Sequence, residues 1–562
     1  MAPPWKAFTL ASGAVAFTLM SLKPAWSTSY FLATFTKLWV VEIGAWVIYA
    51  VFLYPWYFSP LVGLPEPEGD HWLLGQFRRI ARDPSGAPML DWATNIPNEG
   101  LIRYKVPLNQ ERVMPTTAKA LSEVLVTRNY DFEKPAMIRW SLGRILGNGI
   151  LMAEGDEHKR QRKNLMPAFS FRHVKDLYPV FWTKSKESVL AMVDKVRDDA
   201  AKAGTEEKAG VVNPTAVLEI GDWASRATLD IIGVAGLGCD FHAIRDPNNH
   251  LSKMYQDVFK PSKQARVMNL LNLVLPGWIV TNLPIKRNQE IRQASATIRQ
   301  VCLDLVREKK EKYARKELTD VDILSVAIES GGFSDDDLVN QLMTFLAAGH
   351  ETTASAMQWA IYLLCLHPEV QTRLRQEVRE RLPSVDSHQE ITALDIDHLP
   401  YLNAVCNEVL RYYSPVPLTL RQAVVDTSIL GQQIPRGTTV VLCPWAINRN
   451  SFLWGEDAGR FNPDRWLSAK GGDAPASAAT VGSGGASSNY AFLTFLHGPR
   501  SCIGQAFAKA EFACLLAAWV GRFEFDLKNK EEYDEKNMVI KGGVTARPAN
   551  GLWVNAKMLD EW

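Results

Sequence analysis

The chain has 562 residues, of which 62 are Lys or Arg and 61 are Asp or Glu, so its net charge is close to zero. A broad nucleic-acid-binding surface requires a positive excess, and this balance argues against one. The apolar share of 47% is typical of a globular protein with a large core. Seven cysteines are spread along the chain without a CxxC pair, which argues against a disulfide framework and indicates a reducing compartment.

Two apolar segments lie near the start of the chain. Residues 38–58 hold a single charge, Glu42, and a stretch of about 20 apolar residues is long enough to span a bilayer as a helix. The earlier run 8–22 is shorter and fits either a second span or a signal-like segment. We expect residues 1–60 to form a membrane anchor with one or two transmembrane helices. The alternative is that both runs are buried core helices.

A Pro-rich segment at 61–70 follows the anchor and is expected to be a hinge before the body at 71–562. The body mixes many helical patterns with a few strand-like pieces, such as 427–442, which glycines break into short strands. This pattern predicts a mainly α fold with small β-sheets (α+β). The segment 469–489 is rich in Gly, Ala and Ser, and we expect a disordered surface insertion there.

The clearest helix of the body begins after Ser334. Three aspartates follow that serine, which is the usual chemistry of a helix N-terminus, and the pattern stops at His367-Pro368. A helix of about 33 residues would be roughly 50 Å long. Because it is apolar nearly all round, we expect it to be central and buried.

The middle of this helix carries the sequence AGHETT. Thr352 can turn its hydroxyl back to the carbonyl of Ala348, which loosens the helix and can admit a water molecule. Glu351 lies beside it, and an acid next to an alcohol in an apolar helix could form a proton path. The alternative is a packing threonine beside a glutamate that pairs with an arginine, and the motif alone does not decide between them.

Glu408 and Arg411 form an ExxR pair on a later helix. Most pairs with this spacing are exposed and contribute little to stability. This helix is otherwise apolar over much of its surface, and a buried pair needs a further partner. Arg465, in the segment FNPDRW, could supply it.

The stretch FLHGPRSCIG, residues 495–504, places one cysteine among glycines just before a helical run. Arg500 can hold an anion, and a thiolate at the start of a helix is stabilised by free N–H groups. This predicts a socket for a flat anionic cofactor with a metal above the sulfur of Cys502. His158 and Arg162, one helical turn apart, are either an exposed basic face or two donors for carboxylates.

Together these motifs resemble those of the cytochrome P450 family of haem-thiolate monooxygenases. The matching patterns are FxxGxRxCxG at Phe495, Gly498, Arg500, Cys502 and Gly504, AGxET at 348–352, ExxR at Glu408 and Arg411, and FxPxRW at 461–466. Their order and spacing agree with the family, and the resemblance covers roughly residues 65–560. The double apolar N-terminus and the low-complexity insertion resemble membrane-anchored fungal members.

The resemblance implies a haem b (iron protoporphyrin IX) between the central helix and the cysteine loop, with Cys502 as the axial thiolate ligand of the metal. The other implied haem contacts are Phe495, Gly498, Arg500, Gly504, His158, Arg162 and Arg421. Thr352 and Glu351 would be the catalytic residues that deliver protons for dioxygen activation. Glu408, Arg411 and Arg465 would form a buried structural triad. His158 stands where the family often has tryptophan.

The implied function is a haem-dependent monooxygenase that activates dioxygen with electrons from an NADPH–cytochrome P450 reductase, in the endoplasmic reticulum membrane with its catalytic domain facing the cytosol. Apolar segments, among them 541–548, could line the pocket, so we expect a hydrophobic small-molecule substrate. Fungal analogy favours terpenoid or polyketide secondary metabolism. The alternatives are fatty-acid, alkane or xenobiotic hydroxylation, a haem-thiolate isomerase or dehydratase without oxygen insertion, and a cysteine hydrolase.

Overall fold

The computed structural model describes the chain except residues 1–3, 23–30, 203–213, 260–263, 265–266, 269–270, 272–276, 318–321, 469–479, 543 and 561. The helices of the body are α3 (Phe77–Arg82), α4 (Ala87–Asn95), α5 (Ala118–Ser122), α6 (Ala136–Leu146), α7 (Gly155–Leu165), α8 (Phe171–Asp176), α9 (Tyr178–Lys202), α10 (Ile220–Ile231), α11 (His250–Phe259), α13 (Gly277–Asn282), α14 (Lys286–Ala314), α15 (Ile323–Glu329), α16 (Asp335–Leu366), α17 (Pro368–Arg381), α18 (Ala393–Asp397), α19 (Pro400–Tyr412), α20 (Pro444–Ile447), α21 (Ser451–Trp454) and α22 (Gln505–Arg522).

The strands form small sheets, so the predicted mainly α fold with small sheets is confirmed. The strands are β1 (Leu101–Val106), β2 (Gln110–Pro115), β3 (Phe132–Glu133), β4 (Thr215–Glu219), β5 (Thr419–Ala423), β6 (Thr427–Ile429), β7 (Gln432–Ile434), β8 (Thr439–Leu442), β9 (Leu467–Ser468), β10 (Thr480–Val481), β11 (Phe523–Leu527), β12 (Ile540–Gly542), β13 (Ala546–Pro548) and β14 (Trp553–Met558). The five-stranded sheet has the order β1-β2-β8-β5-β3 and the three-stranded sheet the order β11-β14-β4. The remaining pairs are β6–β7, β9–β10 and β12–β13.

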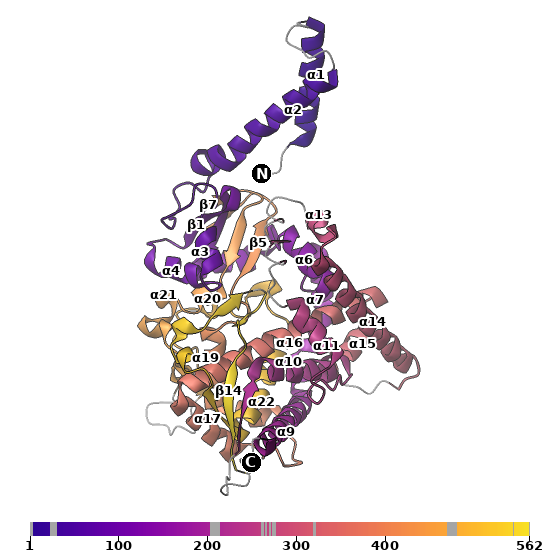
Figure 1. Ribbon diagram of the computed structural model, residues 1–562, viewed down its shortest axis with the longest axis vertical. Coiled ribbons are helices and arrows are strands. Elements are labelled where there is room, and N and C mark those ends of the chain that lie inside the picture. Colours follow the sequence, from indigo (N-terminus) through magenta and orange to yellow (C-terminus); the bar gives the residue numbers. More distant parts are fainter. Residues whose placement is uncertain are drawn as a thin grey trace.

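Helix α16 runs through the middle of the body (Figure 1). It begins where the sequence predicts, because Ser334 and Asp337 form a capping box in which each side chain accepts from the other residue's backbone N–H. Most of its residues are buried, and it packs against α6, α10, α14 and α22. It ends at Leu366, since Pro368 begins the next helix and cannot continue this one.

Two apolar helices, α1 (Trp5–Leu22) and α2 (Phe31–Ile48), stand apart from the body (Figure 1). Both are long and apolar enough to cross a membrane, α2 together with the π-helical segment η2 (Tyr49–Phe58) that continues it. Only 11% and 6% of their apolar windows are buried, so the alternative of two buried core helices is wrong. The hydroxyl of Ser12 in α1 donates to the Glu42 carboxylate of α2 over 3.0 Å.

The end of η2 is fixed to the sheet of the body. Arg103 of β1 donates to the carbonyl of Pro55, which lies in the last turn of this segment. Asn109 donates to the carbonyl of Val51 over 2.9 Å, and the ammonium group of Lys105 lies 4.2 Å from the ring centre of Trp56. The second apolar helix and the first sheet therefore form one continuous unit.

The segment 61–70, expected to be a hinge, lies against β1. The carboxylate of Glu66 binds Arg103 and Lys105, and the N–H of Arg103 donates to the carbonyl of Pro65 over 2.9 Å. Of the expected insertion at 469–489, residues 469–479 lie outside the described residues. In the described remainder, β10 pairs with β9.

Candidate haem site

The cysteine loop joins a short turn, η12 (Gly498–Arg500), to α22. The N–H of Cys502 donates to the carbonyl of Phe495 over 2.8 Å, which closes the loop on itself. Gly498 has a φ of 76°, and a Cβ placed there would lie 2.1 Å from the carbonyl oxygen of Leu125. This glycine is required by both its backbone angle and the close approach of the η4 segment (Glu123–Thr127).

Cys502 is the only exposed cysteine among the seven. Burial nevertheless raises the pKa of its thiol, while the Gly504 N–H and the charge of Arg162 lower it. Cys502 is therefore an exposed residue just before the N-terminal end of α22, with the Gly504 N–H and Arg162 beside it.

Basic side chains from four separate parts of the chain gather beside this loop. They are Lys134 before α6, His158 and Arg162 of α7, Arg421 of β5 and Arg500 of η12. Arg162 donates to the carbonyl and hydroxyl oxygens of Ser501 over 2.7 and 3.2 Å, so it also braces the cysteine loop. Four of these residues were expected together from the family resemblance, and Lys134 is an addition from the structure.

The basic groups are close enough to lower one another's pKa values. Burial and the charges of Arg500, Lys134, Arg162 and Arg421 lower the pKa of His158 to about 4. Burial and the neighbouring arginines Arg421 and Arg500 lower the pKa of Lys134 to about 7, against the opposing effect of Glu154. Burial, followed by Arg500, lowers the pKa of Arg421 to about 10. A shift of this direction in several neighbouring bases is typical of a site that receives an anion.

Among the residues that the structure describes, Glu154 is the carboxylate that forms ion pairs within this basic cluster. One of its oxygens lies 2.6 Å from a terminal nitrogen of Arg500, and the other accepts from the N–H of Lys134 over 2.8 Å. Neither Glu154 nor Lys134 was identified from the sequence. Glu154 is the N-cap of α7, which carries His158, and that position was the available signal.

The donor set fits the carboxylates of a haem. Within the described residues, the buried Nδ1 of His158 and Nε of Arg500 have no hydrogen-bond partner. The buried basic side chains outnumber the single carboxylate of Glu154, and some of their donors are unused. Such a set suits a ligand that carries two negative groups. The accessible sulfur of Cys502 lies in the loop that carries Arg500. The assignment of single residues to the haem stays a prediction.

On α16, Thr352 and Glu351 point to different partners. The Thr352 hydroxyl donates to the carbonyl of Ala348 over 2.8 Å, which is the back-bonding expected from the sequence. One carboxylate oxygen of Glu351 accepts from Thr545 over 3.0 Å and lies 3.1 Å from Arg547. The expected back-bond of Thr352 and an ion pair of Glu351 with an arginine are both present, and the proton path stays a prediction.

The ExxR pair is fully buried and forms a network. Arg411 donates to both oxygens of Glu408 over 2.7 Å, and Arg465 donates to one of them over 3.1 Å. The indole N–H of Trp466 donates to Glu408 over 2.9 Å, and Arg411 also donates to three backbone carbonyls. The second arginine expected from the sequence lies where it was placed, and Trp466 is a further partner.

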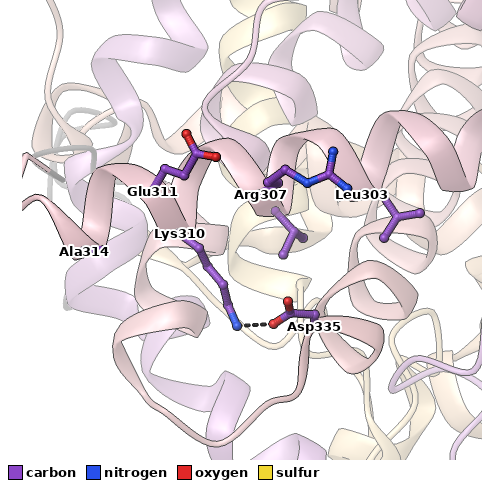
Figure 2. A pocket seen from close by; sticks show the side chains of 7 residues that line it. Leu303, Arg307, Lys310, Glu311, Ala314 and Asp335 are labelled. Atoms are coloured by element: carbon purple, nitrogen blue, oxygen red, sulfur yellow. Dashed lines mark hydrogen bonds and ion pairs between the residues drawn. The ribbon is translucent and has the colours of Figure 1, made fainter.

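A shallow hollow of about 290 Å³ lies elsewhere, between α14 and the start of α16 (Figure 2). Its wall includes Leu303, Arg307 and Lys310, and Lys310 forms an ion pair with Asp335. Its lining contains none of the candidate site residues described above. Among the described residues, no three His, Cys, Asp or Glu side chains gather to hold a metal ion.

Comparisons with known proteins agree with this geometry. The family model for cytochrome P450 matches residues 65–552. Cytochrome P450 monooxygenase ALT8 of Alternaria alternata is 44% identical over 558 residues, 92% of this chain and 93% of the relative. Cytochrome P450 monooxygenase sphH of Aspergillus fumigatus is 47% identical over 537 residues, 94% of each. FUM15 of Gibberella moniliformis, also named a cytochrome P450 monooxygenase, is 43% identical over 561 residues, 93% of each. The chain belongs to the cytochrome P450 family and is an oxygen-incorporating oxidoreductase.

Proposed function

We propose that this enzyme oxidises a hydrophobic small molecule with dioxygen and NADPH-derived electrons, using a haem held by Cys502. The observation that carries the proposal is the accessible sulfur beside a buried basic cluster whose donors are not all used. Haem, when bound, supplies the redox chemistry of dioxygen activation. The remaining roles belong to side chains of this chain.

Four basic residues would bind the two propionates of the haem. Arg500, His158, Arg162 and Arg421 converge from η12, α7 and β5, and each is buried or half-buried. His158 would act as a neutral N–H donor, because burial and its basic neighbours lower its pKa to about 4. Arg162 would have a second task, since its hydrogen bonds to Ser501 hold the loop of the axial ligand.

Phe495, Gly498 and Gly504 would shape the floor of the haem site. Phe495 supplies the carbonyl that accepts from the Cys502 N–H, and its ring is half-buried beside the loop. Gly504 lies in the loop between Cys502 and α22, where a Cβ would meet nothing closer than 3.7 Å of protein. The space there would let the porphyrin approach the backbone.

Thr352 and Glu351 would deliver protons to the oxygen that is being activated. Thr352 keeps its hydroxyl on the carbonyl of Ala348 and so presents an acceptor lone pair to the neighbouring space. Glu351 is the nearest acid along the helix and is largely buried. Glu408, Arg411 and Arg465 would act only as a structural network that holds α19 against the 462–466 turn.

The proposed partner is an NADPH–cytochrome P450 reductase in the same membrane, since no GxGxxG nucleotide loop is evident in the sequence. Two apolar N-terminal helices support a membrane anchor. The endoplasmic reticulum, with the body in the cytosol, is the proposed location because the cysteines are unpaired.

The proposed substrate class is a terpenoid or polyketide of secondary metabolism. The fungal origin of the compared relatives and the apolar segments expected to line the pocket support it. Fatty-acid, alkane or xenobiotic hydroxylation is the second candidate. A haem-thiolate isomerase or dehydratase differs from both in inserting no oxygen.

The ligand assignment is tested by the absorption spectrum of the reduced protein under carbon monoxide. The wild-type protein should show the red-shifted Soret band of a thiolate ligand, and Cys502→Ala should lose that band. Cys514→Ala, a change at a buried cysteine of α22, is the matched control and should keep it. A histidine-type band in the wild type, or an unchanged band in Cys502→Ala, contradicts the assignment.

The reaction and substrate class are tested by deleting the gene in its host and incubating the compound that accumulates with purified enzyme, reductase, NADPH and ¹⁸O₂. One ¹⁸O atom in a terpenoid or polyketide product is expected. A product rearranged or dehydrated without ¹⁸O contradicts the monooxygenase proposal for that substrate. An ¹⁸O-labelled fatty acid or alkane supports the second candidate instead.

A further inference from the structure

The hairpin of β12 and β13 near the C-terminus is fastened along one face of α16. Ser355 and Trp359 both donate to the carbonyl of Ala546, over 2.6 and 2.9 Å. On its other side, the N–H of Ala546 donates to the carbonyl of Pro415 over 2.8 Å. Glu351 lies one helical turn before Ser355, so Glu351, Ser355 and Trp359 form a row at i, i+4 and i+8 that faces the hairpin.

The residues on either side of Ala546 both reach the first member of this row. Side chains at positions i and i+2 of an extended chain lie on the same side, and here they are Thr545 and Arg547. The Thr545 hydroxyl donates to Oε1 of Glu351 over 3.0 Å, and the Arg547 guanidinium lies 3.1 Å from the same oxygen. Two donors from one hairpin thus hold one oxygen of the proposed catalytic acid.

Glu351 is buried, and for that reason its contacts with Thr545 and Arg547 are important for its position. The Glu351 side chain is 8% exposed, so its ionised form needs charged or hydrogen-bonding partners, whereas Arg547 is 26% exposed and reaches solvent. The other oxygen of Glu351 lies 4.0 Å from Nε2 of His350. Burial lowers the pKa of His350, and its Nδ1 lies 2.5 Å from the carbonyl of Leu346, so this ring is a neutral neighbour.

We propose that Thr545 and Arg547 are positioning residues that fix the carboxyl group of Glu351 against the C-terminal hairpin, so that proton delivery depends on how this hairpin is seated on α16. The inference rests on the proposed role of Glu351 and Thr352. Because residues 541–548 are also expected to line the substrate pocket, one hairpin would connect substrate contact with proton supply.

The test uses the full-length protein with its haem, reconstituted with reductase in phosphatidylcholine vesicles and supplied with NADPH but no substrate. Dioxygen is then reduced either by two electrons to hydrogen peroxide or by four electrons to water, and a well-supplied proton path favours water. Arg547→Met and Thr545→Val should each lower the ratio of water to peroxide, with Arg547→Met lowering it roughly tenfold, while Arg547→Lys restores most of it. The solvent deuterium isotope effect on NADPH consumption should change in the same order.

A matched control shows whether the loss of an arginine ion pair elsewhere in the protein has the same effect as the loss of Arg547. Arg245→Met removes an arginine that lies 2.7 Å from Asp194, far along the chain from α16, and should leave the water-to-peroxide ratio unchanged. Unfolding by urea gives a readout that does not need turnover. The effects of Arg547→Met and Glu351→Gln on unfolding should be non-additive, because each removes the partner of the other.

The two levels of the proposal fail in different ways. If Glu351→Gln and Thr352→Ala lower the ratio but Arg547→Met and Thr545→Val do not, the positioning role is overturned and the proton path stands. If Glu351→Gln and Thr352→Ala both leave the ratio unchanged, the proposed proton path itself is overturned. If Arg547→Met only lowers stability, with the ratio and isotope effect of the wild type, the arginine is structural and the inference is wrong.

Discussion

Lys134 is a buried base near the cysteine loop whose charge in the folded protein depends on its neighbours. Its pKa is lowered to about 7 by burial and by Arg421 and Arg500, so above pH 7 it is mostly neutral in the folded protein without haem and charged in the unfolded chain. The unfolded state then binds more protons, and this group makes the free energy of unfolding rise with pH between about 7 and 10.5. Two propionates beside it would favour the charged form again.

Haem loading should therefore take up a proton. At pH 8–9 we expect the haem-free protein to gain up to one proton per haem at Lys134, and Lys134→Met to lose that uptake. Titration calorimetry in buffers of different ionisation enthalpy measures the number of protons. Lys163→Met, on the same α7 helix as His158, is a control that should behave as the wild type. Equal proton uptake in Lys134→Met and the wild type would show that another group titrates.

The two glycines of the cysteine loop should respond differently to the same change. At Gly498 a Cβ would collide with the Leu125 carbonyl and the φ of 76° is unfavourable, so Gly498→Ala should lower the stability of the protein with or without haem, by about 1–3 kcal/mol. At Gly504 the φ is −86° and the nearest protein atom is 3.7 Å away. Gly504→Ala should fold normally and lose haem affinity. Urea unfolding and haem titration of both variants separate the effects, and normal haem binding by Gly504→Ala would mean that the porphyrin does not approach this backbone.

At this scale the sequence shows which residues can do chemistry, but not always what they contact. The position of Cys502 in a glycine loop and the ExxR spacing are local patterns, so they could be read directly. Lys134 and Glu154 were missed because their importance comes from Arg421 and Arg500, which are hundreds of positions away. The partner of Glu351 was foreseen only as some arginine, and Arg547 lies 196 positions later in the chain.

Among the elements, α19 and the 462–466 turn depend on one buried carboxylate. Removing the charge of Glu408 leaves two arginines, Arg411 and Arg465, without their main acceptor in a site that is closed to water. Breaking a buried pair in this way costs about 3–5 kcal/mol. Glu408→Gln should therefore yield little folded protein at 37 °C, measured by urea unfolding and by the yield of haem-bound protein.

Asp457→Asn is the matched control for this network. Asp457 pairs with Arg465 over 2.7 Å but its side chain is 43% exposed, so its loss should cost at most about 1 kcal/mol. A Glu408→Gln protein as stable as Asp457→Asn would show that the network contributes specificity of packing rather than stability.

The boundaries of α16 could be predicted closely because its capping box and the following proline act within a few residues. The strands expected at 427–442 occur as β6, β7 and β8 for the same reason, since glycine breaks between them are local. The seat of β12–β13 on α16 could not be predicted. It depends on hydrogen bonds from Ser355 and Trp359 to a carbonyl that lies nearly 200 positions later, and no local pattern encodes such a contact.

For the whole molecule, we predict that the proposed anchor contributes to the stability of the body. Removing residues 1–30 should leave the fold of the body intact, because the contacts between the apolar helix and the sheet begin at Val51, whose carbonyl accepts from Asn109. Removing residues 1–58 takes away the Pro55 carbonyl, one of the acceptors of Arg103, and the Trp56 ring beside Lys105, and should lower the midpoint of urea unfolding in detergent. Equal midpoints for the two truncations would show that the anchor is only a tether.

The joint between η2 and the β1–β2 ribbon has a consequence for how the enzyme sits on lipid. An apolar helix adjusts to a bilayer thinner or thicker than itself by changing its tilt. Here the helix ends in hydrogen bonds from Asn109 and Arg103 rather than in a slack linker. If this helix spans a membrane as proposed, a change of tilt would lean the entire body by the same angle, so the thickness of the membrane would set which flank of the enzyme faces the headgroups.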